Sequence, residues 1–203
     1  MGLFGSLFRR ARPWDSVVYW ALDLELGGLR PGKDPILSVG MVPIRGGTVR
    51  LGESFRSLVR PPRSLPIDPE SIRIHHLVPE EVAAAPRLIE VLPEITRRVH
   101  EGVLLVHFAA IDLPFLERAY HSCGWIWQGP PVVDTKDLLL RWANYTRPDT
   151  PRELLPLNLA KARTEFGLPD YGVHDALADA VSTAELFLVL RQTLGARSLR
   201  ELR

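Results

Sequence analysis

Two acidic residues, Asp23 and Glu25, stand one residue apart at the end of an apolar run and precede the glycine pair Gly27 and Gly28. In a β-strand, residues i and i+2 point to the same face, so these carboxylates would lie side by side. Two like charges that close repel unless a cation lies between them. Oxygen-only acidic clusters suit hard divalent ions, so the pair indicates the start of a Mg²⁺ or Mn²⁺ site.

The surroundings of this pair support the interpretation, because a pair of acids one residue apart also arises by chance. A second pair, Asp68 and Glu70, flanks Pro69 in a turn-like stretch, whereas Asp23 and Glu25 follow a β-rich run. The alternative that stays open is a solvated strand end.

A further acid, Asp112, follows the apolar run 103–106, which is typical of a strand in the middle of a sheet. Functional residues in α/β sheets gather at the carboxyl ends of the strands. We expect Asp112 where a helix begins, with Pro114 in the first turn of that helix. The alternative role for Asp112 is an N-cap.

The last group of interest is His174, Asp175 and Asp179. Positions five apart on one helix are about 140° out of phase, so His174 and Asp179 converge only if His174 lies in the loop before the helix. Asp175 is a good N-cap and favours that arrangement; alternatively, Asp179 is a solvated acid. His107 and Asp112 have the same spacing, but His107 adjoins a buried strand and fits a structural role more easily.

The elements that would position these residues predict an α/β fold. Strands are expected at 17–24, 35–44 and 48–60, with Gly46 and Gly47 as a hairpin turn, which implies an antiparallel meander. Prolines at 61, 62, 66 and 69 predict a rigid loop. Further strands are expected at 103–106 and 131–133, and helices at 79–84, 88–99, 113–121, 135–142, 153–166 and 175–194. This order predicts a mixed β-sheet flanked by α-helices.

The composition fits one globular domain, with 46% hydrophobic and 24% charged residues in 203. A formal charge of +1 gives no global field for nucleic acid, so affinity for it must come from local patches or bound metal. The single cysteine, Cys123, excludes a disulfide framework. No apolar run approaches a membrane span, so we expect no stable membrane insertion and a cytoplasmic location. Residues 1–14 predict a basic amphipathic leader, and 15–203 the domain itself.

Taken in order, Asp23-Leu24-Glu25, the segment from His107 to Asp112 and the segment from His174 to Asp179 resemble the motifs of the DEDDh, or DnaQ-like, 3′–5′ exonucleases. This family includes the proofreading epsilon subunit of bacterial DNA polymerase III and has a ribonuclease H-like fold. The resemblance extends over residues 17–190. Ile74-His75, Asp134-Thr135 and the segment 157–168 resemble further family landmarks.

The resemblance implies an enzyme that hydrolyses phosphodiester bonds from the 3′ end of single-stranded or frayed DNA or RNA and releases nucleoside monophosphates. By the resemblance, Asp23, Glu25 and Asp179 would hold one divalent cation, Mg²⁺ or Mn²⁺. Asp23 and Asp112 would hold a second, and His174 would act as general base. Histidine side chains titrate near neutral pH, which suits proton transfer from water. A polymerase or another protein partner is also implied.

Two departures from the family pattern concern substrate contacts. Leu26-Gly27-Gly28 replaces the usual Thr-Thr-Gly, which removes two hydroxyls but leaves backbone N–H groups, and Phe108 replaces an asparagine. With His75, these positions are the candidate substrate contacts: Leu26, Gly27, His75 and Phe108. Two other functions remain open: a non-catalytic module that binds nucleic acid or protein on the same fold, and an endonuclease or ribonuclease H-type hydrolase. The sequence does not determine the oligomeric state.

Overall fold

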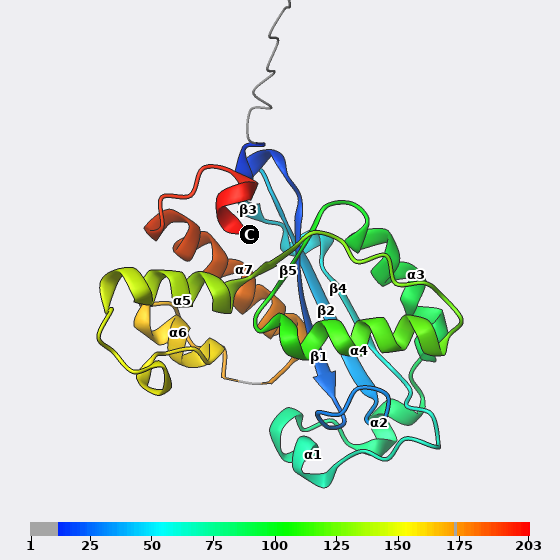
Figure 1. Ribbon diagram of the computed structural model, residues 1–203. Coiled ribbons are helices and arrows are strands. Elements are labelled where there is room, and N and C mark those ends of the chain that lie inside the picture. The colour runs from blue at the N-terminus through cyan, green and yellow to red at the C-terminus, as the bar shows by residue number, and fades with distance from the viewer. Residues whose placement is uncertain (1–11, 173) are drawn as a thin grey trace, which may run out of the picture.

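The fold is built on one mixed β-sheet, seen in a computed structural model that describes residues 12–172 and 174–203 (Figure 1). The strand order is β3-β2-β1-β5-β6, and β4 also pairs with β2. Pairs among β1 to β4 are antiparallel, whereas β5 and β6 continue parallel to β1. The strands are β1 (Tyr19–Leu26), β2 (Ile36–Arg45), β3 (Thr48–Val49), β4 (Phe55–Leu58), β5 (Val103–Val106) and β6 (Val132–Asp134). The predicted mixed sheet is confirmed. Residues 1–11 of the predicted leader lie outside the described residues.

Helices cover both faces of the sheet (Figure 1). On one face lie α5 (Thr135–Thr146), α6 (Leu159–Glu165) and α7 (Ala176–Thr193); on the other lie α3 (Leu88–Val99) and α4 (Ala109–Ser122). The short helices α1 (Pro69–His75) and α2 (Pro79–Ala83) lie near the carboxyl end of β1. The 3-10 helices are η1 (Trp14–Ser16), η2 (Leu51–Glu53), η3 (Arg152–Leu154) and η4 (Leu199–Leu202).

The central strand β1 is apolar on both sides because both sides are covered. Tyr19 and Ala21 belong to the core beneath α7, whereas Trp20 and Leu22 pack into the core formed with α3 and α4. Side chains alternate along a strand, so Asp23 continues the face of Tyr19 and Ala21. The first acidic motif is thereby directed toward α7.

The hairpin between β2 and β3 is confirmed, since Gly46 and Gly47 both have positive φ, at 56° and 74°. The continuous third strand predicted over 48–60 is wrong, because η2 separates β3 from β4. Gly52 is a weak strand former. The carboxylate of Glu53 accepts a 2.7 Å hydrogen bond from Arg45, which holds this turn against β2.

Prolines account for two other errors in the element boundaries, and a third helix begins earlier than predicted. Pro69 opens α1 instead of extending a loop, because Asp68 caps the helix and proline suits its first position. A single helix over 153–166 is wrong: Pro156 lacks an N–H and keeps Leu155 extended, so η3 and α6 are separate. The helix predicted at 113–121 begins earlier, at Ala109, and Pro114 lies inside it.

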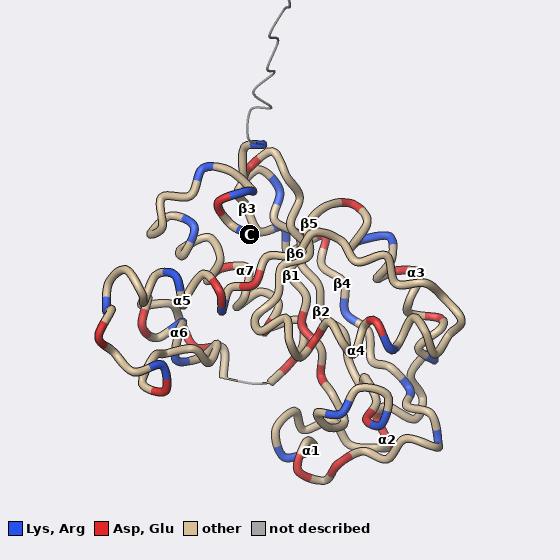
Figure 2. The backbone as a smooth tube through the Cα atoms, viewed as in Figure 1, with Lys and Arg blue, Asp and Glu red and all other residues tan. Residues whose placement is uncertain are grey.

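Basic and acidic positions are interspersed along residues 12–172 and 174–203 (Figure 2). This distribution agrees with a formal net charge of +1. Within the described residues, no helix has the length and apolar character needed to cross a membrane.

Candidate metal centre

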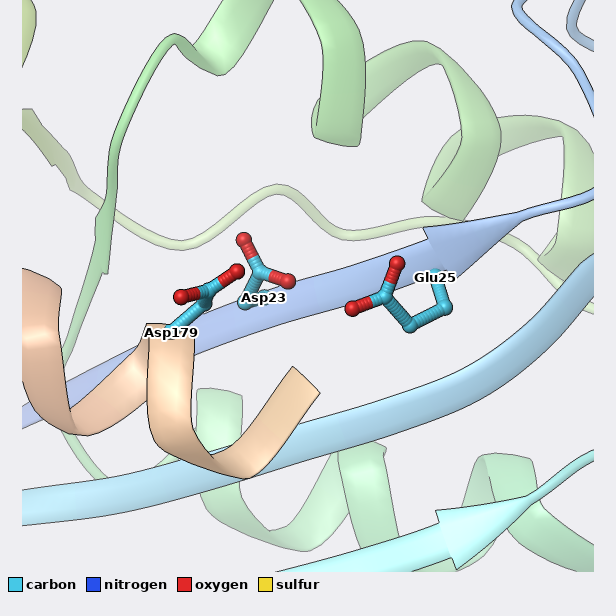
Figure 3. A group of neighbouring side chains, drawn as sticks. All are labelled: Asp23, Glu25 and Asp179. Carbon is cyan, nitrogen blue, oxygen red and sulfur yellow. The ribbon is translucent and has the colours of Figure 1, made fainter. Parts of the chain in front are cut away.

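Three carboxylates from distant parts of the chain converge at the carboxyl end of β1. Asp23 and Glu25 project from β1, and Asp179 projects from the first turns of α7 (Figure 3). Each offers a carboxylate oxygen, and these oxygens all lie within 4.8 Å of one another. The structure therefore brings together the first and third acidic motifs.

Burial and mutual repulsion disfavour the charged forms of these acids. Burial, followed by the charges of Asp179 and Asp175, raises the pKa of Glu25 to about 7. Burial is also the main cause that raises the pKa of Asp179 to about 6 and that of Asp23 well above its usual range. Three acids that resist ionisation in one place form a site where a cation is electrostatically favoured.

Asp112 lines the same cavity as the three acids but does not cap its helix. It lies in the first turn of α4, is 5% exposed, and has a pKa raised to about 8 by burial and then by the charge of Asp134. Its own charge contributes to raising the pKa of Asp23. Asp112 thus lies where a helix begins, as predicted, but the alternative N-cap role is wrong, because Phe108 occupies the N-cap position of α4.

The early start of α4 depends on Asp134. Asp134 belongs to a family landmark in the sequence, but the sequence does not predict this role. Its carboxylate accepts hydrogen bonds from the backbone N–H groups of Phe108 (2.9 Å) and Ala109 (2.7 Å), and also from Lys136 at the start of α5. Phe108 has a positive φ of 77° at this junction. Lys136 Nζ lies 2.9 Å from the centroid of the Phe108 ring. Phe108 is not part of the cavity lining, so its contact with substrate stays a prediction.

The N-terminus of α7 is fixed as the sequence predicts. The Asp175 carboxylate accepts from the backbone N–H groups of Leu177 and Ala178, both at 3.1 Å, and the Asp175 carbonyl accepts from the N–H of Asp179 at 2.9 Å. His174 precedes this cap, and its side chain is 62% exposed with Nδ1 3.9 Å from Asp179 Oδ2. His174 also lines the cavity with the acids.

His107 has the structural surroundings that its position beside a buried strand suggests. Nδ1 lies 2.8 Å from the Thr135 hydroxyl and Nε2 lies 3.0 Å from the Leu157 carbonyl oxygen. With Nε2 donating to the carbonyl, Nδ1 accepts from the hydroxyl, and the neutral ring has both nitrogens satisfied. His107 does not line the cavity of the acids.

The other candidate substrate contacts differ in how accessible they are. His75 and Leu26 line the cavity, and the buried Nε2 of His75 has no hydrogen-bond partner among the described residues. Because His75 Nδ1 accepts from the Leu77 N–H at 3.0 Å, Nε2 of the neutral ring carries the proton. The N–H of Gly27 donates to the Pro35 carbonyl at 2.8 Å, which occupies the backbone donor expected to contact substrate.

Gly40 in β2 allows α7 to reach the acids of β1, and sequence reasoning gave it no role. Gly40 pairs with Asp23, and a Cβ at this position would lie 2.1 Å from the backbone carbonyl carbon of Ala176. Any side chain there would push the first turn of α7 away from β1. The signal available in the sequence was a glycine inside a strand, which often marks a close backbone approach.

The acids fit a divalent cation by the chemistry of their donors. All are carboxylate oxygens, the set that Mg²⁺ and Mn²⁺ prefer. One oxygen of Glu25, Oε1, is buried without a hydrogen-bond partner among the described residues. A buried, unpartnered carboxylate oxygen is costly unless something such as a cation pairs with it.

A mixed sheet covered by helices, with acids gathered at the end of its central strand, is the architecture of the ribonuclease H-like fold. Solved structures agree on the fold: a zinc-bound complex of E. coli exonuclease I with single-stranded DNA has a TM-score of 0.78 and 17% identity, over 89% of this chain and 42% of that one. A second exonuclease I structure has a TM-score of 0.76 and 18% identity, over 91% of this chain and 42% of that one.

The exonuclease family model RNase T matches residues 20–187, and the chain belongs to this family. A DNA polymerase III epsilon-like protein of Rhodobacter capsulatus is 34% identical over 98% of the chain, and the epsilon subunit of Treponema pallidum is 30% identical over 87%. The chain spans 27% of the first relative and 77% of the second. A putative bifunctional exonuclease/endonuclease of Mycobacterium tuberculosis is 32% identical over 86% of the chain, and the chain spans 26% of that protein. The predicted DnaQ-like family is confirmed.

Proposed function

We propose that the chain is a metal-dependent 3′–5′ exonuclease that removes nucleoside monophosphates from a single-stranded or frayed end. The observation that carries this proposal is the convergence of Asp23, Glu25 and Asp179 within 4.8 Å, with His174 beside them. Family membership supports the reaction class.

In this proposal, Asp23, Glu25 and Asp179 hold one divalent ion, and Asp23 and Asp112 hold a second. Such ions, Mg²⁺ or Mn²⁺, would stabilise negative charge on the scissile phosphate and lower the pKa of water. His174 would accept the proton of the attacking water, since it is the exposed histidine beside Asp179. The carboxylates would orient the phosphate by confining the ions to one side of the cavity.

The lining of the cavity favours an unpaired terminal nucleotide. Leu29 and Ile74 line it and are exposed, and Ile111 lines it from α4. Apolar side chains of this kind pack against a base without reading its hydrogen-bonding edge, so a strand end is bound with little sequence preference. His75 lines the same cavity, which makes it a candidate contact for the terminal sugar or phosphate.

Two labelled oligonucleotides test the reaction and its direction. With Mn²⁺ or Mg²⁺, a 5′-labelled strand should give a ladder that shortens by one nucleotide, and a 3′-labelled strand should release labelled mononucleotide first. EDTA should stop both. Internal cuts at early times would identify an endonuclease, and a full-length strand under all conditions would identify a binding module. Matched DNA, RNA and duplex substrates would define the preference.

One substitution, with a matched control, connects this activity to the metal centre. Asp179→Asn should abolish turnover and Mn²⁺ binding while the fold survives, because it removes one of three converging ligands. Asp137→Asn is the matched control, since Asp137 is exposed on α5. Wild-type turnover by the Asp179 variant would contradict the metal assignment.

We also propose that residues 15–203 act as one exonuclease domain in the cytoplasm and that a polymerase or another protein is its partner. Similarity to the epsilon proteins of R. capsulatus and T. pallidum supports the polymerase. Retention of the chain by an immobilised polymerase III catalytic subunit would support this partner, and recovery of the chain in the unbound flow-through would contradict it.

A further inference from the structure

Three residues form a row across the sheet on the face that carries the metal centre. Asp23 in β1 pairs with Gly40 in β2, and Gly40 pairs in turn with Arg56 in β4. Residues directly opposite one another in antiparallel strands point to the same face. The row therefore presents a carboxylate, a bare backbone and a guanidinium to α7.

The first turn of α7 lies on this row. Its backbone at Ala176 occupies the space that a side chain at Gly40 would fill. On one side, Asp179 meets Asp23. On the other side, Arg56 Nη2 lies 2.6 Å from Asp175 Oδ2, in an ion pair with Arg56 52% exposed. The helix start is thus attached at one end to the acids and at the other end to a cation.

Asp175 has a double connection to the metal centre. Its carboxylate caps α7, and its carbonyl accepts the N–H of Asp179, so the position of Asp175 sets that of the metal ligand one turn later. Its negative charge also acts on the neighbouring acids: after burial and Asp179, it contributes to raising the pKa of Glu25. Arg56 supplies a positive charge that offsets this fifth carboxylate.

We infer that Arg56 is a positioning residue of the metal centre, which holds the α7 N-terminus through Asp175 so that Asp179 meets Asp23 and Glu25. This inference rests on the proposed function. It concerns a residue outside the three sequence motifs, on an edge strand, with no ligand role of its own.

The first test is the Mn²⁺ affinity of Arg56→Met, measured by isothermal titration calorimetry. Removing a residue that orients a metal ligand typically weakens metal binding by 10–100-fold, so we expect the Kd for Mn²⁺ to rise about 10-fold, with kcat falling and KM unchanged. Arg56→Lys keeps the positive charge, and its Kd for Mn²⁺ should stay within about threefold of the wild-type value. This result would show that the weaker binding of Arg56→Met comes from the lost charge and not from misfolding. Arg147→Met is the matched control, because Arg147 pairs with Glu165 between α5 and α6.

A double-mutant cycle with Asp175→Asn identifies the route. Asparagine still caps the helix but lacks the charge that Arg56 offsets. If Arg56 acts through Asp175, Arg56→Met should change the Mn²⁺ Kd much less in the Asp175→Asn background than in wild type. An equal change in both backgrounds would overturn the inference, because Arg56 would then act independently of Asp175. A normal Mn²⁺ Kd with a raised and less salt-dependent KM would also overturn it and would identify Arg56 as a phosphate contact. A wild-type chain that binds no Mn²⁺ would refute the metal centre itself.

Discussion

Replacing Glu25 by glutamine tests the electrostatics of the acidic cluster in the metal-free protein. Glu25 is 8% exposed, and its pKa is raised from 4.5 to about 7, chiefly by burial. A carboxyl whose pKa is higher in the folded than in the unfolded state binds its proton more tightly when folded. Ionisation of Glu25 therefore destabilises the fold, and the glutamine variant lacks this term.

The size of the effect follows from the two pKa values. Below pH 4.5 the side chain is protonated in both states and costs nothing; above pH 7 it is ionised in both, and the full cost applies. One pKa unit corresponds to about 1.4 kcal/mol, so the full cost is roughly 3 kcal/mol. Between pH 5 and pH 8, the stability of Glu25→Gln relative to wild type should increase by roughly 2 to 3 kcal/mol.

Urea unfolding in EDTA at pH 5 and pH 8 measures this change. The cost of burying an amide in place of a carboxyl is the same at both pH values, so the difference between the two measurements isolates the charge. Glu117→Gln, at an exposed position on α4, is the control. Adding Mn²⁺ at pH 8 should reverse the order, because wild type retains the better ligand set.

A variant whose stability relative to wild type is the same at pH 5 and pH 8 would refute the reasoning. It would mean that Glu25 ionises in the folded protein as easily as in the unfolded chain. The site would then be open to water, and repulsion among the acids would no longer argue for a cation.

Three further predictions follow from the contacts around the site. His174→Ala should lose 10²–10⁴-fold in turnover yet keep Mn²⁺ affinity. His107→Ala should instead lose about 1–3 kcal/mol of stability and remain active. The reverse pattern would show that His107 is the general base. Gly40→Ala should destabilise the fold by about 3 kcal/mol or more in urea unfolding, because its Cβ meets the backbone of Ala176; a neutral result would contradict the close approach. Arg163→Met should cost about 3–5 kcal/mol in the same assay, because the buried guanidinium bonds three partners on the 169 loop and α7.

The predictable part of the site is the part that local geometry determines. Alternation along β1 places Asp23 and Glu25 on one face, whatever surrounds the strand. The cap at Asp175 is likewise a local preference, and it sets the position of Asp179 one turn later. Neither spacing nor composition predicts that β1 and α7 come together. The resemblance of the three motifs to a known family is what predicts that these acids meet.

The rest depends on contacts between distant segments. The start of α4 is set by Asp134, which reaches back from β6 to two backbone N–H groups and moves Asp112 into the first turn. The roles of Gly40 and Arg56 follow from strand register, which a single sequence does not display. Pro156 breaks the helix predicted over 153–166, because proline cannot donate a backbone hydrogen bond. The prediction gave the helical spacing of the apolar residues more weight than this proline.

The acids of the centre come from the first strand and the last long helix of the described chain. During synthesis, β1 leaves the ribosome well before α7, and the two cannot meet until the helix has emerged and docked. Partly made or proteolytically shortened copies that lack α7 therefore keep Asp23 and Glu25 but lack Asp179. The proposed metal centre therefore assembles only after α7 has docked against β1.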